Sequence, residues 1–456
     1  MHVSQAIGPS AAHPDGLPPE QRLLAIITVV LGLTMAVMDG SIVNLALPTM
    51  AHEMHASAAE AIWIVNSYQI AMAVCLLPLA SLGEVIGHRR IYLLGLVLFT
   101  FASLACTLSG NITQLSLARV LQGLGAAGIL SVNTALIRFI YPVRMLGRAV
   151  GYNALVAGSA SALGPSVAGV ILHVASWHWL FLINIPLGLL ALSIGLRALP
   201  FNPLSARKYD VTSALLCLLF VGLTLYTFDA LAHLQGLSVV LPCGVLAAAV
   251  LWMLLRLQSA SAPMLPLDLL RIPLFGLSIS TSICAFAAQS TVLVMLPFLL
   301  QNQLGLPAAK AGLLLTTWPI TLAMAGLLSG RLSDRIAAGL LGGLGLAVLT
   351  AGLLGLLCVQ QSTPTPVIAL LLGVCGIGFG IFQSPNNRAM ISASPRTRSG
   401  AASGMLGTAR LTGQTLGAAL VALILNTSAI PYPVVLYCAA SLAGVACVVS
   451  LTRLRF

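Results

Sequence analysis

The sequence predicts an all-α polytopic membrane protein with fourteen transmembrane helices. Of its 456 residues, 59% are hydrophobic and only 7% are charged, a composition far from that of soluble globular domains. A hydrocarbon core about 30 Å thick requires roughly 20 apolar residues per helix, and apolar runs of that length fill the chain almost from end to end. Backbone polar groups inside a bilayer must be satisfied within their own segment, so these runs are expected to be helices.

The elements follow one another in order. Residues 1–22 are polar and form a predicted cytoplasmic tail, and the next apolar run is too long for a cleaved leader, so it is interpreted as a retained first span. We predict one six-helix bundle over residues 23–200, a linker with two additional helices over 201–260, and a second six-helix bundle over 261–456. The predicted spans are 23–48, 60–83, 91–110, 113–138, 149–173, 179–199, 211–231, 237–256, 274–300, 309–329, 339–358, 366–390, 401–425 and 432–452.

Basic residues mark one side of the predicted membrane protein. Counted from an inside N-terminus, every second loop is basic, whereas the predicted outward loops hold only Lys310. The positive-inside rule therefore predicts that both termini are cytoplasmic. The formal net charge of +11 is scattered through short loops without a continuous patch, which argues against a nucleic-acid partner. The inside positions are Arg89, Arg90, Arg144, Arg148, Arg207, Lys208, Arg271, Arg331, Arg335, Arg396, Arg398, Arg453 and Arg455.

Several chemistries have no sequence signature here. The nine cysteines lie singly inside apolar segments, which is typical of packing residues rather than of a metal cluster or a disulfide framework. The chain has no phosphate-binding loop, HExxH motif or pair of catalytic carboxylates. We therefore expect a protein that is not an enzyme, holds no metal or cofactor, and takes its energy from an ion gradient.

Two similar turns follow a span in each half of the chain. They are ASLGEVIGHRR at residues 80–90 and GRLSDRIAAG at residues 330–339, and their recurrence indicates an internal duplication of the kind found in secondary transporters. The first turn resembles the G-x-L-x-D-R-x-G-R-R loop of the major facilitator superfamily through Gly87, Arg89 and Arg90. It departs from that pattern at Glu84, where the family usually has aspartate. The second turn keeps Asp334 and Arg335.

Four further segments resemble the 14-span drug:proton antiporter family within that superfamily. They are MDGSIVNLALP at 38–48, LARVLQGLGAAG at 117–128, GSASALGPSVAG at 158–169 and WHWLFLINIPLG at 177–188. The resemblance implies a major facilitator fold, with two pseudosymmetric six-helix bundles and two extra central helices. It assigns gating and conformational roles to Asn44, Pro48, Glu84, Gly87, Arg89, Arg90, Gln122, Gly123, Gly164, Pro165, Gly169, Asp334 and Arg335.

The function that the resemblance implies is proton-coupled efflux of lipophilic, often cationic drugs, dyes or antiseptics by alternating access. Its setting would be a bacterial inner membrane, and we expect a monomer. Two alternatives stay open: a proton-coupled carrier for one native metabolite or amphiphile on the same fold, and a receptor or scaffold that transports nothing.

Asp39 is the predicted proton site, because it lies in the middle of the apolar run from Leu23 to Met50. A carboxylate at that depth is costly in its charged form and so favours a functional interpretation. Arg119, in the fourth span, is expected to tune proton release from Asp39. The structural alternatives are a carboxylate that accepts hydrogen bonds from Ser41 or Asn44, and a buried Asp39–Arg119 pair that serves stability alone.

Aromatic residues inside the predicted spans are candidates for a substrate pocket, because aromatic faces attract lipophilic cations. These are Trp63, Tyr68, Trp318 and Phe382, with the alternative that they are interface anchors or core residues. Arg410, in the thirteenth span, is a further candidate for this pocket. Its alternative is a side chain that extends to the membrane surface.

Overall fold

The computed structural model describes residues 16–142, 145–202, 204, 209–232, 236–258, 265–333, 335–394 and 399–455. Within these ranges, fourteen helical segments are long and apolar enough to cross a membrane, and no residue is in a β-strand. The prediction of an all-α protein with fourteen spans is confirmed. Most of the predicted tail and six of the residues singled out above lie outside the described ranges, namely Arg144, Arg207, Lys208, Asp334, Arg396 and Arg398.

The helices follow the predicted order, with the sixth span divided into two pieces at Ile183. Their bounds are α1 Pro19–Glu53, α2 Ala58–Ile86, α3 His88–Thr107, α4 Ile112–Ile140, α5 Leu146–Val174, α6 Trp179–Leu182, α7 Asn184–Ala198, α8 Val211–Ala232, α9 Leu237–Leu257, α10 Pro273–Phe298, α11 Ala308–Leu332, α12 Ala338–Leu356, α13 Thr365–Ala393, α14 Ser399–Thr427 and α15 Pro431–Thr452. A π-helical turn, Leu299–Gln303, follows α10.

Local sequence explains several of the helix ends. Ser57 and Glu60 form a reciprocal capping box at the start of α2, which satisfies backbone N–H groups that the first turn leaves free. Gly87 separates α2 from α3 with φ of +110°, a conformation that only glycine adopts without strain, so the two helices follow each other directly. By contrast, α1 continues through the buried Pro48 to Glu53, beyond the predicted end at residue 48.

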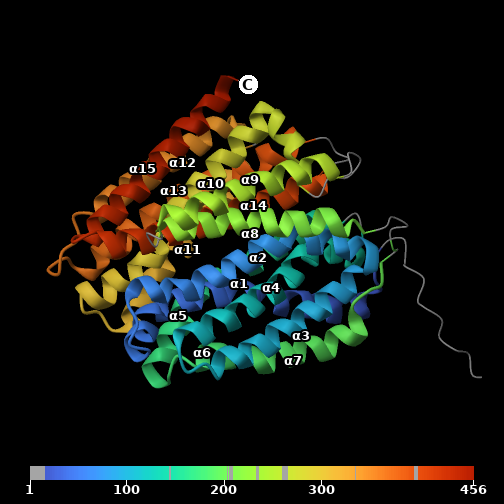
Figure 1. The fold of residues 1–456 in the computed structure, drawn as a ribbon, viewed down its shortest axis with the longest axis horizontal. Helices are drawn as coiled ribbons and strands as arrows, with labels where there is room; N and C mark the ends of the chain where they lie inside the picture. Colours follow the sequence, from blue (N-terminus) through green and yellow to red (C-terminus); the bar gives the residue numbers. More distant parts are fainter. Residues whose placement is uncertain are drawn as a thin grey trace, which may run out of the picture.

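The helices form two bundles that lie side by side, α1–α7 (blue to green) and α10–α15 (yellow to red), as Figure 1 shows. Helix α8 packs against α2 of the first bundle and α14 of the second, and α9 packs against α8. The two additional helices therefore lie at the boundary between the bundles. The residue limits 200/201 and 260/261 that we assign to these units stay a prediction.

The bundles meet through the helix pairs α2–α14, α5–α11 and α1–α10. The contact between α5 and α11 is close, because a side chain at Gly312 would collide with the carbonyl oxygen of Pro165. The hydroxyls of Ser166 and Thr316 are hydrogen-bonded beside it, 2.6 Å apart. One hydrophobic core contains buried residues from both bundles. The first bundle alone supplies the polar site described next.

Candidate functional site

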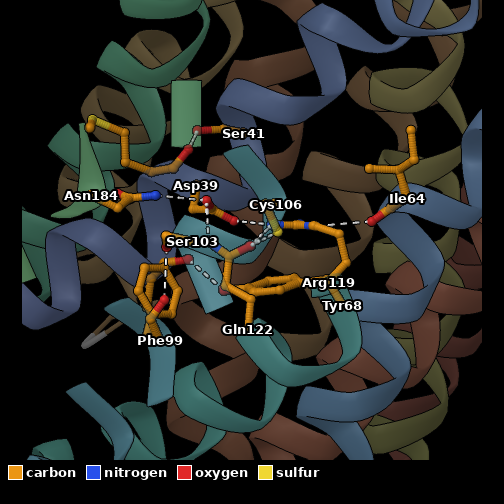
Figure 2. A network of polar contacts seen from close by, with 12 residues as sticks. Asp39, Ser41, Ile64, Tyr68, Phe99, Ser103, Cys106, Arg119, Gln122 and Asn184 are labelled. Carbon is orange, nitrogen blue, oxygen red and sulfur yellow. Dashed lines mark hydrogen bonds and ion pairs between the residues drawn. The ribbon is translucent and has the colours of Figure 1, made fainter. Parts of the chain in front are cut away.

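Three helices of the first bundle bring a polar cluster into its apolar interior (Figure 2). Asp39 lies near the middle of α1 and is 2% exposed. Arg119 and Gln122 are three residues apart on α4, so they face α1 from the same side of their helix. Asn184 is the first residue of α7 and follows the break in the sixth span. The cluster joins positions 39, 119–122 and 184, which are far apart in the sequence.

Both carboxylate oxygens of Asp39 accept hydrogen bonds. Oδ2 forms an ion pair with Nη1 of Arg119. Oδ1 accepts a bond from Nε2 of Gln122 at 2.9 Å and a bond from Nδ2 of Asn184 at 3.1 Å. All three partners are donors, an arrangement that stabilises the ionised carboxylate. The structure therefore shows a site in which the carboxylate charge is fully paired.

Hydrogen bonds and a ring contact fix the position of the Arg119 side chain. Its Nε donates to the carbonyl of Ile64 at 3.0 Å, and its Nη1 also donates to Oε1 of Gln122 at 2.6 Å. The guanidinium carbon lies 4.1 Å from the centre of the Tyr68 ring, a cation–π contact. Tyr68 is itself anchored, because its hydroxyl donates to the carbonyl of Ala36 at 2.9 Å. These contacts fix the guanidinium plane beside Asp39.

A second layer orients Gln122. Its Nε2 also donates to Oγ of Ser103 at 2.9 Å, and Sγ of Cys106 donates to its Oε1 at 3.5 Å. The Ser103 hydroxyl donates in turn to the carbonyl of Phe99, 2.8 Å away. Helix α3 thereby supports the amide that contacts the carboxylate.

The sequence suggested Ser41 or Asn44 as hydrogen-bond donors to Asp39 if this carboxylate had only a structural role, but neither residue donates a hydrogen bond to it. Ser41 donates to the carbonyl of Met38 at 2.9 Å, and the buried Oδ1 of Asn44 has no hydrogen-bond partner among the described residues. The carboxylate contacts Gln122 and Asn184 instead. Both residues stand in motifs that carry the family resemblance, but their spacing along the chain gives no indication that they meet.

Four of the predicted gating residues lie at close helix contacts, namely Gly123, Gly164, Pro165 and Gly169. A side chain at Gly123 would meet the backbone of Tyr68, one at Gly164 would collide with Ser41, and one at Gly169 would meet Ala309 of α11. Pro165 faces Gly312 as described, and Pro48 is buried within α1. The structure brings Gly164 and Gly169 to contacts between α5 and the helices α1 and α11, and it brings Gln122 into the cluster with Asp39.

The turn at residues 83–90 contacts the end of α7 and the segment that follows it. Arg89 donates to the carbonyl of Leu196 and stacks on Phe201, with 4.1 Å from the guanidinium carbon to the ring centre. The backbone N–H of His88 donates to Oδ1 of Asn202 at 2.8 Å. Glu84 is exposed, and Arg90 donates to the carbonyl of Ile86 at 3.3 Å. In the second copy of the turn, Arg335 is exposed, and Asp334 lies outside the described residues.

The five candidate pocket residues do not form one cluster. Tyr68 lies on Arg119, whereas Phe382 packs edge-to-face on Phe379 in the core of the second bundle. Trp318 is buried on α11, and Trp63 is half-buried on α2. Arg410 lies near Tyr68, on α14, the helix that packs against α2 at the boundary between the bundles.

A second polar cluster, which the sequence pattern does not predict, lies in the second bundle. Arg453 is 3% exposed and donates from Nη1 to Oγ of Ser278 at 3.0 Å and to Oδ1 of Asn386 at 2.6 Å. It also donates to the side chain and carbonyl of Ser450. Arg453 lies just beyond the last predicted span, so the sequence predicts a solvent-exposed cation in a cytoplasmic segment. The sequence indicates such a cluster through two polar residues, Ser278 and Asn386, which lie inside two apolar helices.

The described residues contain no group of three or more His, Cys, Asp or Glu side chains that could hold a metal ion, and the nine cysteines are unpaired. The site is therefore one ion pair with amide and hydroxyl support. A buried carboxylate of this kind, inside a multi-pass helical protein of two bundles, is characteristic of membrane transporters.

Comparison with known proteins agrees with this class. The family model described as "Major Facilitator Superfamily" matches residues 29–418 and, a second time, residues 278–455. The chain belongs to the major facilitator superfamily. The second match, confined to the second half, agrees with the internal duplication indicated by the repeated turns.

Relatives cover most of the chain. It is 50% identical over 415 residues to "Uncharacterized transporter YebQ" of Escherichia coli K12, with 90% of this chain and 91% of that protein covered. It is 31% identical to "Multidrug resistance protein Stp" of Mycobacterium tuberculosis, covering 89% and 76% of the two chains. It is 28% identical to "Riboflavin transporter RibZ" of Clostridioides difficile, covering 88% and 87%. The chain is a transporter and not an enzyme.

A solved structure shows the same fold. The crystal structure of a D-xylose-proton symporter aligns with a TM-score of 0.68 at 14% sequence identity, over 94% of this chain and 97% of that one. This likeness supports the major facilitator architecture alone.

Proposed function

We propose that this chain exports small lipophilic compounds from the cell in exchange for protons, with Asp39 as the proton site. The observation that carries the proposal is the ion pair of Asp39 and Arg119, buried in the middle of an apolar bundle. An ionisable residue at that depth is costly to retain for structure alone, because apolar residues of similar volume pack there without a desolvation penalty.

In the proposed cycle, protonation of Asp39 releases Arg119 from its partner. The free guanidinium then interacts more strongly with Tyr68 and Ile64, and the change in charge biases α1 and α4 between two packings. Release of the proton restores the arrangement in the structure. A population shift of this kind needs only a differential interaction of the proton with the two packings.

In this proposal, the helices move relative to one another at their close contacts. Gly164 leaves room for the Ser41 side chain of α1, and Gly169 lets α5 approach the backbone of α11 at Ala309. Small residues of this kind allow helices to pack closely. Alternating access would then open and close the α5–α11 and α2–α14 contacts. We place both termini in the cytoplasm and the protein in a bacterial inner membrane, as a monomer.

A direct test uses cells that accumulate a fluorescent dye. Expression of the chain should lower dye accumulation, and an uncoupler should restore it, because the proposed energy source is the proton gradient. The relative named as a multidrug resistance protein supports this choice of substrate class. Accumulation that is insensitive to the uncoupler would contradict proton coupling.

A second candidate is a carrier for one metabolite on the same fold. The relative named as a riboflavin transporter, which is similar over nearly the same length, favours it. The two candidates separate in one experiment, because a metabolite carrier would show gradient-driven flux of a single compound without resistance to unrelated dyes.

A further inference from the structure

Arg410 lies where the two bundles meet. Helix α14 packs against α2 and α10, and its Gly404 and Gly407 face the side chains of Leu77 and Leu76 on α2. Arg410 follows on the same helix and lies near Tyr68 of α2. Tyr68 is the ring on which Arg119 stacks. Arg410 is therefore the cation of the second bundle that lies next to the proton site of the first.

The guanidinium of Arg410 has no partner among the residues that the structure describes. The side chain is half-buried: its Nε is buried without a hydrogen-bond partner, whereas the two terminal nitrogens are not among the fully buried atoms. It forms no ion pair with a described residue. The two fully buried arginines differ. Arg119 is bound to a carboxylate, an amide and a carbonyl through Nη1 and Nε, although its Nη2 has no partner, and Arg453 is bound to two hydroxyls, an amide and a carbonyl. Arginine keeps its charge, so the accessible terminal nitrogens of Arg410 are free to donate to the acceptor of another molecule.

Among the described residues, no acidic side chain forms an ion pair with Arg410. The sequences of α10 to α15 contain no aspartate or glutamate but several arginines and one lysine. In the first bundle, the carboxylate of Asp39 is already occupied by Arg119, Gln122 and Asn184. In the part of the chain that the structure describes, the charge of Arg410 therefore has no counter-ion. A cationic ligand there would meet repulsion, and a ligand with a negative or strongly accepting group would be attracted.

We propose that Arg410 binds the transported compound directly, through an anionic or strongly hydrogen-bond-accepting group on an otherwise apolar body. Carboxylates, sulfonates, phenolates and conjugated carbonyls are such groups, and the planar guanidinium pairs well with them. The site discriminates against permanent cations. This inference rests on the proposed transport function and specifies its substrate class, and it differs from the cationic substrates expected from the aromatic residues alone.

Binding to the purified protein in lipid nanodiscs tests the inference without a need for transport. The probes are a lipophilic anionic oxonol dye, the cation ethidium and uncharged riboflavin, each followed by fluorescence anisotropy with empty nanodiscs subtracted. The wild type should bind oxonol more tightly than ethidium. Arg410→Gln should weaken oxonol binding about tenfold or more, because a charge-assisted hydrogen bond is lost, while ethidium binding stays the same or improves.

Two further variants control for charge and folding. Arg410→Lys should keep most of the preference for the anion, since it retains the charge. Arg331→Gln removes a charge from an exposed position on α11 and should leave oxonol binding unchanged. The proposal is overturned if Arg410→Gln binds oxonol like the wild type, if it loses oxonol and ethidium equally, or if Arg331→Gln weakens oxonol binding as much.

Gradient-driven flux of the same probes in everted vesicles separates the two claims. Binding of oxonol that depends on Arg410, together with the absence of gradient-driven flux for every probe, would refute the proposed export and uphold the binding site. Coupled flux of ethidium in preference to oxonol, unaffected by Arg410→Gln, would uphold export and overturn the binding site.

Discussion

Arg119 pairs with Asp39 across the interface of α4 and α1, and the two side chains are only 0% and 1% exposed. A pair so fully removed from water depends on every surrounding donor and acceptor, because each unsatisfied charge there is expensive. Gln122, Asn184, Ile64 and Tyr68 supply that environment. Removal of Asp39, Arg119 or one of these neighbours should therefore leave a buried polar group without its partner.

Replacement of Arg119 by alanine should destabilise the protein by about 3–5 kcal/mol, because it leaves a buried carboxylate without its counter-charge. Arg119→Lys should be destabilising to a smaller degree, since lysine keeps the charge but loses the bond to Ile64 and the stacking on Tyr68. Thermal unfolding in detergent measures both. Lys310→Ala, at an exposed position, is the control and should unfold like the wild type. An Arg119→Ala variant as stable as wild type would show that the pair contributes nothing to the fold.

Substitution of a glycine by alanine should lower the stability of the protein at a close helix contact but not at a position with open space beside it. Gly164→Ala and Gly312→Ala place a methyl group against Ser41 and against the carbonyl of Pro165, so each should cost about 1–3 kcal/mol through overpacking. Gly158→Ala, also on α5, meets no atom within 4 Å and should be neutral or slightly stabilising. Unfolding temperatures of the three variants compare them directly. Equal effects at all three positions would contradict the close approach of α5 to α1 and α11.

The Arg453 cluster should stabilise the second bundle. Asn386→Leu removes the amide oxygen that accepts from Arg453 and should cost about 1.5–3 kcal/mol, the range for hydrogen bonds to charged groups. Ser441→Ala, which removes an exposed hydroxyl bonded only to its own helix, is the matched control on α15 and should have little effect. A loss of stability in Ser441→Ala equal to that in Asn386→Leu would contradict a specific contribution of the Arg453 cluster.

Much of the fold could be predicted because membrane spans can be recognised from the amino-acid composition of a segment alone. An apolar run of about 20 residues has one solution in a bilayer, so all fourteen spans follow from the sequence. Helix ends were harder, since they depend on single residues. Pro48 and Ile183 show this: helix α1 passes through the first, and the sixth span breaks at the second.

The candidate site could be predicted only in part. Asp39 and Arg119 were visible because charged residues inside apolar runs are rare, and the resemblance linked them. The amides of Gln122 and Asn184 were not assigned to Asp39, because a contact between residues 145 positions apart depends on how α1, α4 and α7 pack. Arg453 was missed for the same reason, since its burial is created by helices α10 and α13.

The most direct test of the central claim is transport driven by an imposed pH gradient in everted vesicles, comparing the wild type with Asp39→Asn at equal protein level. The uncharged amide has nearly the same shape but takes up no proton, so coupled transport should fall to the level of vesicles without the protein. Equilibrium exchange of the same compound, which needs no proton, should persist and shows that the variant is folded. Gradient-driven transport that survives unchanged in Asp39→Asn would contradict the account and place the proton site at another residue.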